Sequence, residues 1–188
     1  MEKELIEEMR GIIHSYYPRG VPVDDPAYFD SDEARRLEAM RLRAVKNDHD
    51  WNRLLEALRA ASPDCRIEDW THLATDKDAS YRCRVEMPPG ESLHAVVACV
   101  SILVPFYLVY SSQVRRLQDR FAPPEVRYEL TDEEAGYGQV VTSNIEAIFG
   151  YSPMPPDIGM QPVSDVAVGN VEIGKATLYD CLFTDDRW

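Results

Sequence analysis

The sequence predicts an α+β fold: N-terminal helices, then a mainly antiparallel sheet, a further helix near residues 132–149 and short C-terminal strands. The first observation behind this prediction is a change of hydrophobic period, from helical spacing in residues 1–62 to alternation of apolar and polar residues in the part 63–188. The second is the order of segments, because helices precede strands instead of alternating with them. The 188 residues, 45% hydrophobic and 28% charged, fit a single globular domain.

Three helices are expected in the N-terminal part, at residues 2–16, 31–46 and 48–62. Pro18 ends the first helix, because proline cannot continue regular helical hydrogen bonding. Ser31 is a favourable N-cap for the second helix, and two acids follow it in the first turn, where they complement the helix dipole. Pro63 closes the third helix. The proline-rich residues 19–28 are expected to form a loop.

The pattern of residues in the middle of the chain predicts strands. Residues 81–87 alternate apolar and charged side chains, as in a strand with one buried and one wet face. Residues 93–110 contain no Asp, Glu, Lys or Arg, and their length is close to that of a membrane-spanning helix. Because Pro105 interrupts this stretch and β-branched and aromatic residues fill it, we expect two buried strands, 92–104 and 106–112. Shorter strands are expected at residues 66–70, 126–130, 163–168 and 176–183. Residues 113–121 are expected to form a short helix or the end of a strand.

A later helix is predicted by its end signals. Thr131 and Glu134 match a capping box and place the start of the helix there. Gly136 and Gly138 leave two alternatives: they allow close packing, or they delay the start of the regular helix. Gly150 is a suitable C-terminal cap.

The sequence contains no motif of a catalytic, metal or cofactor site. The four histidines form no HxH, HxxxH or HExxH pair, the four cysteines form no CxxC, and no GxSxG or phosphate-binding glycine loop occurs. Cys181 follows Asp180, and an adjacent acid raises the pKa of a thiol instead of activating it. We therefore interpret Cys181 as a packing residue, and expect no catalytic residue, no metal and no cofactor.

The first residues, MEKELIEEMR, are acidic where a secretory signal has a basic start followed by an apolar stretch. We therefore expect a cytoplasmic protein. In that compartment thiols stay reduced, so all four cysteines are expected to be free.

Acidic residues are concentrated in the last part of the chain. The formal net charge is −13, and residues 121–188, with 12 acids and 3 bases, carry −9 of it. This charge repels nucleic acids and anionic membranes, and it attracts a basic protein. Because aromatic residues accompany the acids, we expect a face on which charge steers the partner and rings anchor it; the alternative is an acidic surface that only maintains solubility. The candidate partner-binding residues are Asp132, Glu133, Glu134, Tyr137, Tyr151, Asp157, Asp180, Asp185, Asp186 and Trp188.

In its size, its acidic C-terminal part and its acidic–aromatic ending YDCLFTDDRW, residues 179–188, the chain resembles bacterial immunity proteins. Members of that class are cytoplasmic inhibitors that bind a cognate toxin domain, often a basic nuclease. The resemblance implies a non-catalytic inhibitor whose carboxylates meet the lysine and arginine cluster of a toxin and block its active site.

Two other classes of function stay open on the residues alone. A small enzyme with a site assembled from dispersed residues predicts a deep pocket with converging polar groups and shifted pKa values. A homo-oligomeric scaffold subunit predicts an apolar, self-complementary surface patch. A homodimer is compatible with each of the three classes.

Overall fold

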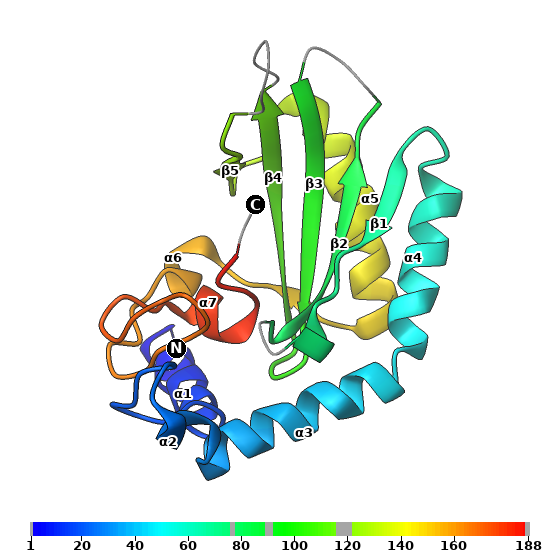
Figure 1. The fold of residues 1–188 in the computed structure, drawn as a ribbon. Helices are drawn as coiled ribbons and strands as arrows, with labels where there is room; N and C mark the ends of the chain where they lie inside the picture. The colour runs from blue at the N-terminus through cyan, green and yellow to red at the C-terminus, as the bar shows by residue number, and fades with distance from the viewer. Residues whose placement is uncertain (1, 76–77, 89–91, 116–121, 187–188) are drawn as a thin grey trace.

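The structure is a computed structural model in which residues 2–75, 78–88, 92–115 and 122–186 are described. Figure 1 shows a twisted sheet with helices on both of its faces, which is the expected α+β fold. The helices are α1 (Glu2–His14), α2 (Pro26–Phe29), α3 (Asp32–Lys46), α4 (His49–Ala61), η1 (Leu73–Thr75, a 3₁₀ turn), α5 (Asp132–Phe149), α6 (Pro156–Gly159) and α7 (Leu178–Leu182). The strands are β1 (Arg66–Asp69), β2 (Ser80–Glu86), β3 (Ser92–Ser101), β4 (Phe106–Arg115), β5 (Glu125–Arg127) and β6 (Ser152–Pro153).

The strands lie in the order β1-β2-β3-β4-β5, and each neighbouring pair is antiparallel. The two-residue strand β6 joins β4 in the parallel direction. β3 is central: Cys99 lies between Arg82 of β2 and Leu108 of β4 in the register, and it is fully buried. The apolar stretch around Pro105 is therefore two strands, and none of the described helices is long and apolar enough to cross a membrane.

The two faces of the sheet carry two separate cores. One face packs against α4 and α5, where Leu54 and Ile145 are completely buried. The other face packs against α1 and α7, where Ile13 is completely buried. Because successive residues of a strand point to opposite faces, Val96 and its neighbour Val97 in β3 belong to different cores.

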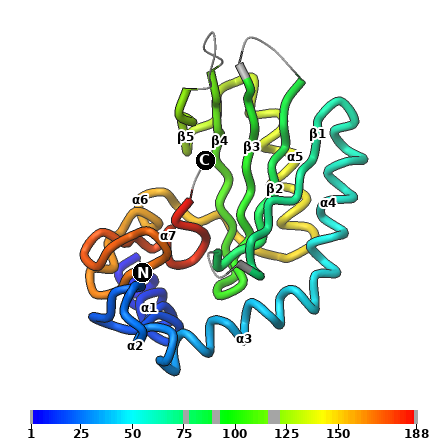
Figure 2. Tube along the Cα trace, in the orientation of Figure 1, coloured from blue at the N-terminus to red at the C-terminus, as the bar shows by residue number. Residues whose placement is uncertain are grey.

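The two terminal segments of the chain pack against each other. Figure 2 shows α1 next to the segment that carries α6 and α7. Tyr17, just after α1, is buried, and its hydroxyl donates to the carbonyl oxygen of Cys181 at 2.7 Å. His14 Nε2 and Arg19 Nε contact the two carboxylate oxygens of Asp165, at 3.0 and 2.7 Å. From this assembly α3 runs past the end of the sheet to α4 (Figure 1).

The expected helix ends are confirmed. Ser31 Oγ accepts the N–H of Ala34 at 3.1 Å and caps α3. Thr131 and Glu134 form the expected capping box, so α5 is regular from its first turn, through both of its glycines. Gly150 ends α5 with φ +68°, a left-handed conformation that glycine adopts without steric cost.

The prediction of a strand at residues 176–183 is wrong, because most of this segment is helix α7. The cause is local: the Thr177 side chain accepts the N–H of Asp180, and the Asp180 carboxylate accepts the N–H of Thr177, which makes a second capping box. The loop expected at residues 19–28 also ends in a helix, the short α2.

Two further expectations need correction or lie partly outside the described residues. The segment 163–168 is not a strand, since it contains a single isolated bridge, Val168 to Val171, and the bridge Pro162 to Thr177 lies just before it. Of residues 113–121, the first three extend β4, and 116–121 lie outside the described part of the chain.

The close packing of α6 on α7 gives a stability prediction. A Cβ atom at Gly159 would lie 2.1 to 2.5 Å from three ring atoms of Tyr179, whose ring is completely buried and cannot move aside. We expect Gly159→Ala to lower the free energy of unfolding by about 2 kcal/mol, measured by urea denaturation.

The matched control is Gly136→Ala in α5, where a Cβ would meet no atom within 4 Å. This variant is expected to be more stable than the parent protein by about 0.5–1 kcal/mol, because alanine is the better helix former. Equal effects of the two substitutions would contradict the packing of α6 on α7.

Candidate functional site

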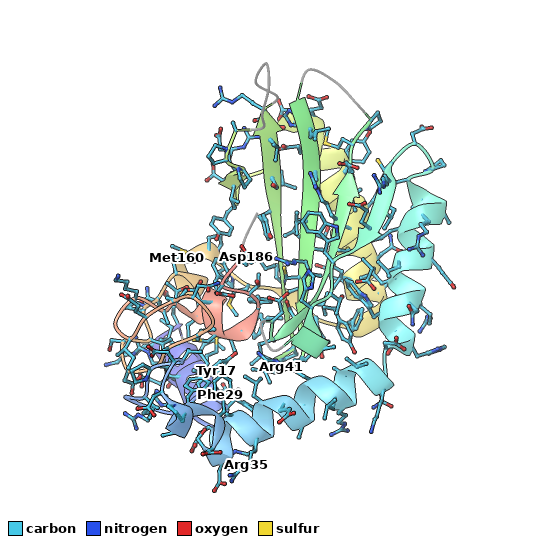
Figure 3. All side chains as sticks on the ribbon, in the orientation of Figure 1. Tyr17, Phe29, Arg35, Arg41, Met160 and Asp186 are labelled. Atoms are coloured by element: carbon cyan, nitrogen blue, oxygen red, sulfur yellow. The ribbon has the colours of Figure 1, made fainter. Side chains whose placement is uncertain are left out.

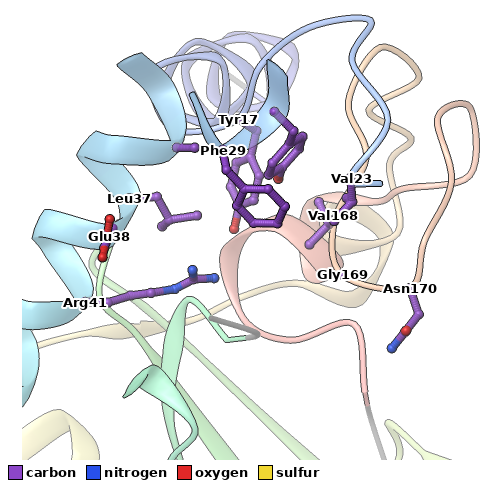
Figure 4. A pocket seen from close by; sticks show the side chains of 11 residues that line it. Tyr17, Val23, Phe29, Leu37, Glu38, Arg41, Val168, Gly169 and Asn170 are labelled. Atoms are coloured by element: carbon purple, nitrogen blue, oxygen red, sulfur yellow. The ribbon is translucent and has the colours of Figure 1, made fainter. Parts of the chain in front are cut away.

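A cavity of about 440 Å³ lies between α2, α3 and residues 168–170. Figure 4 shows α3 side chains on one side, the 168–170 segment on the other, and Phe29 between them. We call it the aromatic cavity, and its volume lies in the range of pockets that hold ligands. Its aromatic and apolar lining comes from Tyr17, Val23, Tyr28, Phe29, Leu37 and Val168.

Helix α2 places two aromatic side chains in different environments. Asp25 Oδ1 accepts the N–H of Ala27 at 2.9 Å and caps the helix. Tyr28 is buried and donates to the carbonyl oxygen of Ala167 at 3.2 Å, which ties α2 to the C-terminal segment. Phe29 is 60% exposed and packs edge-on against Tyr28 at 5.4 Å. Phe29 therefore offers an aromatic surface at the mouth of the cavity.

Arg41 reaches from α3 into the base of the aromatic cavity (Figure 4) and is only 8% exposed. Its Nε donates to the carbonyl oxygen of Asp78 at 2.9 Å. Burial raises the pKa of Tyr28 to about 12 and raises that of Tyr17 well above its usual value, although the charge of Arg41 opposes both shifts. Both phenols are therefore neutral at physiological pH, and neither supplies a base or nucleophile.

The wall opposite α3 is held by Asp185. Asp185 Oδ2 accepts the backbone N–H of Asn170 at 2.7 Å and its side-chain amide at 3.2 Å. Gly169 has φ +54°, and a Cβ there would lie 2.3 Å from Asp185 Oδ2. Only glycine fits between the carboxylate and the turn, so Asp185 positions the wall and is not free to meet a partner.

A second hollow of about 410 Å³ adjoins the aromatic cavity, and both are lined by Val23, Gly169 and Asn170. We call the two hollows together the terminal groove, because their walls come from residues 17–41 and 167–173. The groove therefore exists only where the two ends of the chain meet.

Two exposed acids line the terminal groove and a third follows Phe29 in the sequence, and the guanidinium of Arg41 also lies in the aromatic cavity. Asp24 lines the second hollow, Glu38 lines the aromatic cavity, and Asp30 directly follows Phe29. None of the three forms an ion pair with another residue of the described ranges. The groove thus combines an exposed aromatic ring with carboxylates that form no ion pair within the described ranges.

Three of the candidate residues from the sequence come together elsewhere. Asp132, Glu133 and Tyr137 lie in the first turns of α5, at the far end of the sheet from α2 (Figure 1). Both acids are exposed, and the Tyr137 hydroxyl is hydrogen-bonded to the Cys65 thiol. They form a small acidic surface separate from the terminal groove.

Two other candidate acids are not at the surface. Glu134 and Asp180 are 1% and 4% exposed. Each carboxylate accepts the N–H and the hydroxyl of its own capping residue, Thr131 and Thr177 respectively. Glu134 also binds Arg127 at 3.1 Å. Both acids therefore stabilise helix starts, which corrects their expected role as steering charges.

The remaining candidates do not share one surface. Asp157 is exposed on α6, and Tyr151 lines a different recess. Asp186 is half-buried, and Figure 3 shows it apart from the labelled residues of the terminal groove. Trp188 lies outside the described residues.

The terminal groove was missed by the sequence analysis, although a signal for half of it exists. The run VDDPAYFD, residues 23–30, has the same acidic–aromatic composition as the C-terminal ending that was singled out. The other half, residues 167–173, has no such composition, and its place opposite α2 follows only from the tertiary structure.

Within the described ranges, no three side chains of histidine, cysteine, aspartate or glutamate converge as a metal site. The four cysteines are free thiols, as expected, and burial raises the pKa of the Cys83 and Cys181 thiols. Comparison with protein-family models, curated proteins and solved structures gives no match.

The stability that the Glu134 capping box contributes is expected to depend on pH. Burial favours the neutral acid, but hydrogen bonds from Thr131 and the charge of Arg127 outweigh it and lower the pKa of Glu134. A lowered folded-state pKa means that the stabilisation is complete above the usual glutamate pKa and is lost as the pH falls through the lowered value. We expect Glu134→Gln to cost about 1–2 kcal/mol of unfolding free energy at pH 7, and markedly less at pH 3.

Denaturation curves of parent and variant between pH 7 and pH 3 measure this difference. Glu133→Gln is the control, because the Glu133 side chain is exposed and pairs with no cation in the described structure. A Glu134→Gln effect that stays constant with pH would contradict the charged capping box.

Proposed function

We propose that this chain is a non-catalytic inhibitor that binds a basic protein, in the manner of bacterial immunity proteins, and that the terminal groove is its binding surface. The observation that carries the proposal is the combination at the groove of the exposed Phe29 ring with the carboxylates of Asp24 and Glu38, which form no ion pair within the described ranges. The groove takes over the role that the sequence analysis gave to the C-terminal acids.

The aromatic cavity supports binding by an anchor. The binding energy of protein interfaces is concentrated in a few aromatic or arginine side chains that fill pockets, surrounded by contacts that exclude water. A cavity of about 440 Å³ behind an exposed phenylalanine has room for one such side chain from a partner. Tyr17 and Tyr28 are fixed by hydrogen bonds to backbone carbonyl groups, so this part of the wall is ordered before a partner arrives.

The charges support the choice of a basic partner. A carboxylate in an ion pair contributes little to the long-range field, whereas Asp24, Asp30 and Glu38, which form no ion pair within the described ranges, contribute more. The chain as a whole carries −13, so the field around the groove adds to a general attraction for cations. Such fields raise the rate of association more than they raise the affinity.

The first test combines capture and rescue. The tagged chain is incubated with lysate of its source cells, and captured proteins are identified by mass spectrometry and then expressed with and without the chain in a growth assay. We expect capture of a basic protein whose toxicity the chain suppresses. Phe29→Ala is expected to reduce both capture and rescue, because it removes the exposed ring without disturbing the core.

Asp157→Asn is the matched surface control, because Asp157 is exposed on α6 and does not line the groove. It should behave as the parent protein does. Capture of a basic protein that is equally strong with Phe29→Ala, or a captured protein whose activity is unchanged by the chain, would refute the proposal.

A second test separates steering from anchoring, with the captured partner immobilised on a biosensor. The triple variant Asp24→Asn, Asp30→Asn, Glu38→Gln is expected to slow association about ten-fold at low salt, and the difference should shrink as salt rises. Phe29→Ala is expected to accelerate dissociation with little change in association. An unchanged association rate in the triple variant would show that these acids do not steer the partner.

A further inference from the structure

A second recess, of about 340 Å³, lies on the other half of α3 and shares no lining residue with the terminal groove. Its walls come from five elements, α3, α4, β2, β3 and α5, and from Tyr151, which lies two residues after α5. The side chains used below are Arg43, Trp51, Tyr81, Ser101, Phe149 and Tyr151, and we call this site the indole recess.

Four aromatic rings in two pairs line the indole recess. Trp51 and Tyr81 are stacked, with ring centroids 5.1 Å apart and an interplanar angle of 16°. Phe149 and Tyr151 lie 5.6 Å apart in a tilted arrangement. Phe149 and Tyr151 are only half-buried, so their rings are accessible to a flat apolar molecule.

The polar groups inside the indole recess are hydrogen-bond donors. Trp51 is 2% exposed, and its indole Nε1–H has no acceptor in the described part of the chain. The Nε1 atom itself is closed to solvent, so the Trp51 ring forms part of the wall of the recess and donates no hydrogen bond to a ligand there. Ser101 Oγ accepts the N–H groups of Leu103 and Val104 at 3.1 and 3.4 Å, so its own proton is available to donate.

Two more donors lie nearer the solvent. Burial raises the pKa of Tyr151, so its hydroxyl stays protonated at neutral pH. Arg43 is exposed and forms no ion pair with any residue described. The carboxylate that lines the recess, Asp50, is already paired with Arg53 at 3.0 Å, and Asp48 also lies near Tyr81. Among the lining residues, the charge without an ion pair in the described structure is therefore that of Arg43, and the carboxylate of Asp48 lies outside the lining.

We propose that the indole recess binds a small aromatic carboxylate, with its ring against Phe149 and Tyr151 and its carboxylate on Arg43. A guanidinium binds a carboxylate through paired, charge-assisted hydrogen bonds, which gives this class of ligand its advantage over neutral ones. The site is independent of the proposed inhibitor function, because it uses none of the residues of the terminal groove.

The test uses the full ¹⁵N-labelled chain and three probes with one ring system: indole-3-acetate, its neutral amide indole-3-acetamide, and the cation tryptamine. The indole N–H signal of Trp51 in the ¹H–¹⁵N spectrum, assigned by its loss in Trp51→Phe, reports a ligand in the recess, because the Trp51 ring lines it. We expect indole-3-acetate to shift this signal with a Kd of about 0.1–1 mM, and to bind about ten-fold more tightly than the amide.

Arg43→Gln is expected to weaken indole-3-acetate binding about ten-fold while leaving the weaker binding of the amide unchanged. Arg35→Gln is the matched control, since it makes the same charge change at the other end of α3, where Arg35 pairs with Asp32 at 3.1 Å. This variant should bind as the parent chain does.

Tighter binding of tryptamine than of indole-3-acetate would show that the recess selects cations, and would overturn the proposal. A Trp51 signal that none of the three probes shifts, or an equal loss of binding in Arg43→Gln and Arg35→Gln, would overturn it as well. These measurements need no partner protein, so their failure is distinguishable from a failure of the inhibitor function.

Discussion

The structure depends on the burial of α7 between α1 and one face of the sheet. The hydroxyl of Tyr17 bonds the backbone of Cys181 from one side, and the backbone N–H of Ala79 donates to the carbonyl oxygen of Phe183 from the other, at 2.9 Å. These bonds connect the first residues, the sheet and the last described residues in one core. Because that core is assembled from distant parts of the chain, its formation brings the two ends together and creates every feature that lies between them.

The terminal groove is the main such feature. Neither of its walls carries a binding site alone: the α2 wall supplies aromatic rings and acids, and the wall at residues 168–170 closes the cavity behind Phe29. Their relative position is set by hydrogen bonds such as that between Tyr28 and Ala167, within the lining of the groove itself. A protein surface organised in this way meets its partner in a preformed state, which reduces the entropy lost on binding.

The sequence predicted the elements well wherever a local signal determines the backbone. Ser31, Thr131 and Gly150 mark helix ends through hydrogen bonds within a few residues, and the structure contains each of them. The same local chemistry explains the main error, because Asp180 was counted as a surface charge although its spacing from Thr177 is that of a capping box. The groove was not predictable in this way, since no local pattern tells which distant segment faces residues 23–30.

The contact between Gly169 and Asp185 shows that the groove has two kinds of position, those where a substitution disturbs the backbone and those where it does not. A side chain at 169 would displace the carboxylate that holds the turn, so this pair belongs to the scaffold. Phe29 and Glu38 extend from α2 and α3 toward solvent, and their replacement leaves that scaffold intact. Under the proposed inhibitor function, exchange of a few mouth residues alters the choice of partner, while the architecture that presents them stays the same.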